Sequence, residues 1–176
     1  MKFALVSLLV IVSLAVFGCS SVEINYDFDQ QADFNRYKTF QWMTPETQMS
    51  SLLGNRISSA VAAELASKGL QSVSDDPDLM VTYHAGAQDK VDITSSGYGY
   101  GYGRYGGVYG GGYGGGIETY NYTEGTLIID IIDASRKELV WRGTATGVLD
   151  DNPSPEKVDQ NVRDVVAKIL VNYPPK

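Results

Sequence analysis

The chain has few of the side chains that ligate soft metals or cross-link a fold. Its 176 residues include one cysteine, Cys19, and one histidine, His84. A single cysteine excludes an internal disulfide. One cysteine and one histidine are also too few for a zinc site, which requires several such ligands. We therefore expect neither a metal nor a cofactor.

Basic residues are also scarce. Lysine and arginine together number 14, against 21 aspartates and glutamates, which gives a formal net charge of −7. Coulomb repulsion then disfavours a nucleic acid or an anionic lipid surface as the partner. The length suits one folded domain with a real core, and it is too short for two ordinary domains.

Long apolar runs are absent, with one exception near the N-terminus. A basic start, Met1-Lys2, is followed by the run FALVSLLVIVSLAVF at residues 3–17 and then by Gly18 and Cys19. As a helix this run would be about 22 Å long, short of the ~30 Å hydrocarbon core of a bilayer. The pattern predicts a secretory signal over residues 1–18, cleaved between Gly18 and Cys19, and disfavours a permanent membrane span.

The tetrad Val16-Phe17-Gly18-Cys19 resembles a bacterial lipobox, although Phe17 stands where a small residue is usual. The resemblance implies that Cys19 is lipidated on sulfur, becomes the first residue and is acylated on nitrogen. Several fatty acyl chains such as palmitate make a firm membrane anchor. The alternative is an ordinary apolar cysteine inside a secretory signal. Ser20 stands where aspartate would resemble an inner-membrane retention signal, so we expect the outer membrane of a Gram-negative cell, facing the periplasm.

Residues 19–23 form a short tether, and residues 24–176 form one α+β domain. Alternating apolar and polar residues predict strands at 24–28, 37–42 and 79–84. Apolar residues at helical spacing predict helices at 51–68 and 155–173; Gly69 would end the first and Ser154 would cap the second. We expect an antiparallel sheet of about five strands in the order ββαβββα, a two-layer sandwich with both helices on one face.

The best-formed pair of strands covers residues 126–133 and 138–146. The first is a nearly continuous β-branched run, typical of a central strand. In the second, alternation places Leu139, Trp141, Gly143 and Ala145 on the core side.

No catalytic constellation is recognisable, so we expect no enzyme. Asp130 and Arg142 could pair across neighbouring strands, but no second carboxylate or nucleophile can be placed beside them. His84 should lie on the face opposite Leu79, Val81 and Tyr83, with no identifiable partner. The acidic turn of Asp75, Asp76 and Asp78 lacks the oxygen-rich twelve-residue calcium pattern and is better interpreted as a solvated turn. An enzyme with an acidic site around Asp130 or Asp78 remains an alternative.

Residues 97–116 read GYGYGYGRYGGVYGGGYGGG. Ordering so many glycines is costly, so the segment is predicted to have little order, at the tip of a hairpin between the third and fourth strands. Residues 101–106 match G-x-G-x-x-G by letters only, because the dinucleotide-binding mechanism needs a preceding strand and a following helix.

This low-complexity segment has two interpretations. It is either a tolerated insertion or a platform for sugar rings, peptidoglycan or another protein. The tyrosines of such a platform would be Tyr98, Tyr100, Tyr102, Tyr105, Tyr109 and Tyr113. RNA binding is disfavoured by a single arginine in an acidic chain.

Several blocks together resemble the bacterial lipoprotein family called domain of unknown function 4136. These blocks are the lipoprotein start, YKTFQW at 37–42, KGL at 68–70, DLMVTY at 78–83, EGTL at 124–127, LVWRG at 139–143 and YPP at 173–175. The resemblance implies a compact α+β domain in the cell envelope, with no established activity or catalytic residues. We expect a non-enzymatic envelope binding or assembly factor. The alternative is a glycan or small-ligand binder that uses the tyrosine segment or an open sheet face.

Overall fold

The computed structural model describes residues 22–43, 51–95 and 117–176. The elements follow in the order β1 (Glu23–Phe28), the 3-10 turn η1 (Phe34–Arg36), β2 (Thr39–Trp42), α2 (Ser51–Ser67), β3 (Gln71–Ser72), β4 (Leu79–Ser95), β5 (Ile117–Asp133), β6 (Glu138–Val148) and α3 (Pro155–Leu170). The predicted signal segment, Cys19 and the glycine–tyrosine segment lie outside the described residues.

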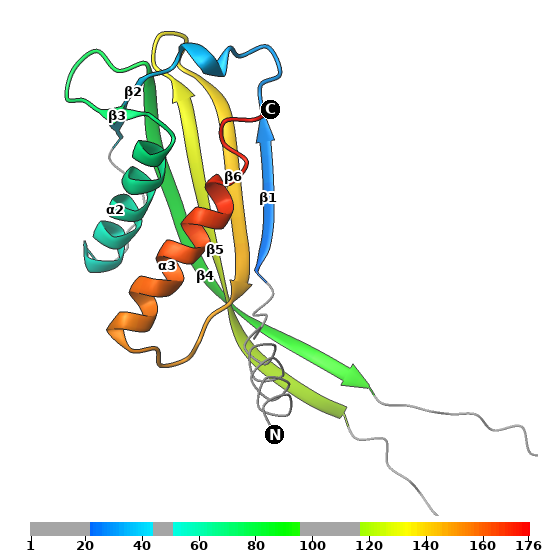
Figure 1. Cartoon of the computed structure of the whole chain (residues 1–176). Coiled ribbons are helices and arrows are strands. Elements are labelled where there is room, and N and C mark those ends of the chain that lie inside the picture. The colour runs from blue at the N-terminus through cyan, green and yellow to red at the C-terminus, as the bar shows by residue number, and fades with distance from the viewer. Residues whose placement is uncertain (1–21, 44–50, 96–116) are drawn as a thin grey trace, which may run out of the picture.

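The predicted mixed α+β class is confirmed, with both helices on one face of one sheet (Figure 1). The prediction of about five antiparallel strands is wrong. The sheet has six strands in the order β1-β6-β5-β4-β2-β3, and β2 runs parallel to both β4 and β3. The chain passes through α2 between β2 and β4, and such a crossover makes two strands parallel. β3, only two residues long, has too little alternation to be seen in the sequence.

The core lies between the sheet and the two helices. Its largest fully buried side chains include Trp141, Phe40 and Leu65, from β6, β2 and α2. Gly143 allows α3 to approach β6, because a Cβ at this position would overlap the Trp141 ring and the Ile169 side chain. The Ser154 hydroxyl caps α3 and Gly69 adopts a φ of 90° after α2, as predicted, but α3 ends at Leu170, three residues before the predicted end.

A β-bulge in β6 overturns the predicted alternation there. Ile131 pairs with Trp141 but Ile132 pairs with Leu139, so Val140 is an extra residue in β6. Trp141 is buried as predicted, and Val140 is buried beside it. Leu139 was expected in the core, yet 45% of its surface is exposed on the other face.

β4 and β5 extend far beyond the rest of the sheet. β6 ends at Val148, opposite Glu124 of β5. Residues 89–95 of β4 then pair only with residues 117–123 of β5 among the described strands. We call these two stretches the β4–β5 arm; Figure 1 shows the arm projecting from the body of the domain. The prediction that the strands flanking the glycine–tyrosine segment form a long hairpin is confirmed for these flanks.

Candidate functional site

The face of the sheet opposite the helices is uncovered by any described element; we call it the bare face (Figure 1). The register places its side chains in three rows across the strands. These rows are Met80, Ile132 and Leu139; then Thr82, Asp130, Arg142 and Asp27; then His84, Ile128, Thr144 and Asn25. A charged row therefore lies between two rows that contain apolar side chains.

Asp130 and Arg142 form a bidentate ion pair in the middle of the bare face. The distances are 2.6 Å from Arg142 Nε to Asp130 Oδ1 and 2.6 Å from Nη2 to Oδ2. The hydrogen bonds to Asp130 raise the pKa of Arg142. Asp130 is only 4% exposed. The predicted pairing is confirmed.

His84 lies on the face predicted for it. Its Nε2 is 3.7 Å from Asp130 Oδ2, so His84 lies beside the ion pair on the neighbouring strand. Sequence reasoning found no partner for this histidine, because its proximity to Asp130 depends on the β4–β5 register. The cluster holds one carboxylate whose two oxygens are already bound by arginine, which leaves no oxygen aimed at a substrate.

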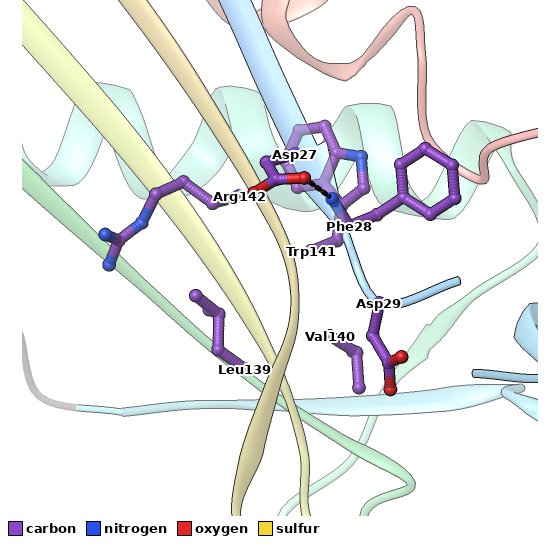
Figure 2. A pocket seen from close by; sticks show the side chains of 7 residues that line it. All are labelled: Asp27, Phe28, Asp29, Leu139, Val140, Trp141 and Arg142. Atoms are coloured by element: carbon purple, nitrogen blue, oxygen red, sulfur yellow. Dashed lines mark hydrogen bonds between the residues drawn. The ribbon is translucent and has the colours of Figure 1, made fainter. Parts of the chain in front are cut away.

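A shallow depression of about 320 Å³ lies beside this cluster, between β1 and β6 at the bulge. It is lined by Asp27, Phe28, Asp29, Leu139, Val140, Trp141 and Arg142. Figure 2 shows the Arg142 guanidinium directed away from Asp27, whose carboxylate accepts a hydrogen bond from the Phe28 amide at 2.9 Å. The polar groups of the depression do not converge on one point, as a small-molecule site would require.

A second carboxylate, Asp133, is fully buried at the end of β5 and binds donors from two separate parts of the chain. The donors are the Arg36 guanidinium, the Tyr37 hydroxyl at 2.8 Å, the Ser135 amide and hydroxyl at 2.9 and 2.6 Å, and the Arg136 amide and Nε at 2.9 and 3.2 Å. Burial alone would raise the pKa of Asp133, but these hydrogen bonds outweigh burial and hold the pKa well below its ordinary value. Burial, and then the bond to Asp133, raise the pKa of Tyr37.

Sequence reasoning missed the Asp133 network. The available signal was the turn Asp133-Ala-Ser135-Arg136, where an aspartate side chain commonly accepts from amides further along the turn. Arg36 and Tyr37 could not have been found in this way, because they are about a hundred residues away in the sequence.

The acidic turn before β4 is only partly solvated. Asp75 and Asp76 are exposed, but Asp78 Oδ2 accepts from the Lys38 amide at 2.8 Å and from the Thr39 amide at 3.0 Å. The hydrogen bond from the Lys38 amide lowers the pKa of Asp78. Asp78 therefore connects β4 to the start of β2. No cluster of three or more potential metal ligands occurs in residues 22–43, 51–95 and 117–176.

The other predicted site residues lie outside the described part of the chain. They are Gly18 and Cys19 of the lipidation motif and Tyr98, Tyr100, Tyr102, Tyr105, Tyr109 and Tyr113 of the glycine–tyrosine segment. Neither α2 nor α3 has the length and hydropathy needed to cross a bilayer.

Two solved structures share the fold. A PDZ domain protein from Parabacteroides distasonis matches 94% of this chain with a TM-score of 0.59 and 17% identity, and the chain spans 39% of that protein. PelC from Paraburkholderia phytofirmans, solved as a dodecamer, matches 85% of this chain and 95% of its own, with a TM-score of 0.50 and 14% identity. No curated protein sequence matches significantly.

These likenesses concern the fold alone, whereas the family match rests on the sequence. The sequence model of one family matches residues 24–175, which is nearly the whole of the predicted domain. The chain therefore belongs to the family described as Domain of unknown function (DUF4136).

Proposed function

We propose that this protein is a lipoprotein anchored through Cys19 to the outer membrane, facing the periplasm, where it binds or assembles envelope components without catalysing a reaction. The lipobox-like residues 16–19 support the anchor. The observation that supports a binding role is the bare face, a broad sheet surface that carries apolar side chains around an internally neutralised ion pair.

The chemistry of the bare face suits contact with a protein. Met80, Ile132 and Leu139 offer apolar area, while the charge of Asp130 is already compensated by Arg142. A partner can cover such a surface without leaving a buried charge unpaired, which is the main electrostatic cost of an interface. The PelC dodecamer has the same fold, so the fold is compatible with assembly from many copies.

Catalysis has weaker support. Each of the two buried carboxylates, Asp130 and Asp133, is bound through both oxygens by donors of this chain. A general acid or base needs a carboxyl group within reach of substrate, and a nucleophile needs a free base beside it. The described residues contain neither arrangement in a concave site.

A photo-crosslinking amino acid at Thr144 tests the binding role in intact cells. Thr144 lies on the bare face, and Gln160 on the exposed side of α3 is the matched control. We expect a discrete adduct from position 144 and little from position 160. Equal adducts from both positions would contradict the bare face as the binding surface.

Metabolic labelling with an alkyne fatty acid tests the anchor. Wild-type protein should be labelled and should fractionate with the outer membrane, whereas Cys19→Ala should be unlabelled. Acylated Cys19→Ala protein in the outer membrane would contradict the proposed lipidation site.

The β4–β5 arm favours a second candidate function, glycan binding. Both strands continue well past the sheet and lead directly to the ends of the glycine–tyrosine segment, whose tyrosines could stack on sugar rings. Deletion of residues 97–116 should then abolish retention on purified peptidoglycan. Unchanged retention, or no retention of the wild type, would exclude this candidate.

A further inference from the structure

β1, β6 and β5 are neighbours at the end of the sheet where β1 begins. A Cβ on Gly147 would lie 3.3 Å from Val22, so the start of the described chain packs against the end of β6. The Leu149 amide donates to the Thr123 carbonyl at 2.9 Å, and the Leu149 side chain lies over Gly125 of β5. Figure 1 shows the β4–β5 arm leaving the body at this same end.

This end exposes large apolar side chains. Val148 is 66% exposed and Leu149 is 46% exposed at the end of β6, and Val91 on the arm is 59% exposed. Tyr120 of the arm is also exposed and stands opposite Asp92 in the β4–β5 register. Half of the exposed large apolar side chains in the described part of the chain therefore belong to this end of β6 and the arm.

The short tether indicates what covers this end. Val22 follows Cys19 by three residues, and an extended chain spans at most about 3.6 Å per residue, so Val22 lies within about 11 Å of the lipidated cysteine. This step rests on the proposed function, in which the acyl chains of Cys19 are inserted in a bilayer. The start of β1 and the end of β6 must then lie close to the lipid headgroups.

The tether does not reach the opposite end of the sheet. Leu139 and Val148 lie nine positions apart on β6, which corresponds to about 30 Å along a strand. A tether of three residues is much shorter than this distance. The tether therefore leaves the Asp133 end free to stand about 30 Å farther from the membrane than the β1 end.

Charge selects the lipid. The residues around this end are mainly acidic, namely Glu23, Asp89, Asp92, Glu124, Asp150 and Asp151, and Lys90 is paired with Glu124 at 2.5 Å. An anionic headgroup would be repelled, whereas a zwitterionic headgroup would not. Exposed valine, leucine and tyrosine side chains suit insertion at headgroup depth.

We propose that Val148 and Leu149, at the end of β6, rest on a zwitterionic lipid surface and hold the lipidated domain end-on. The bare face stands perpendicular to the membrane and is open to partners from the side.

Site-directed spin labelling tests this orientation. The lipidated full chain, in which Cys19 has no free thiol, is reconstituted in vesicles of phosphatidylcholine and phosphatidylethanolamine. A nitroxide is placed at Val148→Cys or at the control Leu139→Cys, which is exposed on the same face of the same strand. We measure how accessible each nitroxide is to collision with a water-soluble nickel chelate and with lipid-soluble oxygen.

The nickel accessibility of the label at position 148 should be at least threefold lower than that of the label at position 139. Its oxygen accessibility should be higher. Leu149→Cys, the neighbouring exposed site, should behave like position 148. Replacing half of the lipid by phosphatidylglycerol should reduce the protection.

Three results would overturn the proposal. Equal nickel accessibility at positions 148 and 139 in vesicle-bound protein would reject the lipid contact while leaving the anchor intact. Protection of both positions would indicate contact between copies along the bare face instead. Wild-type protein that does not carry acyl chains or bind vesicles would reject the anchor and the orientation together.

Discussion

Asp130 and Asp133 lie three residues apart on β5, both are buried, and both bind arginine, yet their surroundings differ. Asp133 lies on the helix side of the sheet and collects donors from η1, from Tyr37 and from the turn after β5. Asp130 lies on the bare face and binds one arginine from the adjacent strand, with His84 nearby. Asp133 thus connects segments that are distant in sequence, whereas Asp130 neutralises a surface that remains open.

The largest expected effect comes from removing the Asp133 carboxylate. Asp133→Ala leaves the buried Tyr37 hydroxyl and the turn amides without an acceptor, so the free energy of unfolding should fall by about 2–4 kcal/mol. Urea denaturation measures this change. Asp27→Ala is the matched control, because Asp27 is exposed and bonds only its neighbouring amide; it should cost less than about 0.5 kcal/mol. Equal effects would contradict a structural role specific to Asp133.

Acid should weaken the Asp133 end of the sheet selectively. The folded protein holds the pKa of Asp133 and Asp78 below the ordinary carboxyl value, so both contribute stability that is fully present above about pH 4. This stability is lost as the pH falls from there through the folded pKa values. Between pH 5 and pH 2.5 the wild type should lose about 1–2 kcal/mol more than Asp133→Asn, which cannot titrate. Parallel pH profiles of the two proteins would exclude this linkage.

The Asp130–Arg142 pair should contribute less, about 1 kcal/mol, since roughly half of the Arg142 side chain is exposed and solvent screens the pair. A double-mutant cycle of Asp130→Ala and Arg142→Ala measures the coupling between the two side chains by urea denaturation. Arg142→Ala alone should cost more than the double variant, because it leaves an almost buried carboxylate without its cation. A coupling near zero would show that the pair has no role in stability.

Most of the individual strands and helices could be predicted from the sequence, but few of the contacts between distant segments could. Alternation and helical periodicity located β1, β2, β5, α2 and α3, because each signal depends on neighbours within a few residues. The bulge at Val140 exposed Leu139 against the predicted alternation, since an extra residue is visible only from pairing with β5. The parallel pairing of β2 with β4 likewise depends on where α2 returns the chain.

The same distinction explains the results for the candidate site. The Asp130–Arg142 pair was predictable because a short hairpin brings its two residues together. His84 and the Arg36–Asp133 contact required the register of strands that are far apart in the sequence.

The smallest expected effect is on the arm. Residues 89–95 and 117–123 pair only with each other among the described strands, so the core between the sheet and the helices does not depend on what joins them. Deleting residues 97–116 and joining Ser96 to Ile117 through an Asn-Gly turn should change the melting temperature by less than about 2 °C. Ile129→Ala, a core change in the same strand, should cost about 2–5 kcal/mol and lower the melting temperature clearly. A large drop on deletion would show that the segment packs on the core, and would remove the contrast between a stabilised Asp133 end and an opposite end available for contacts.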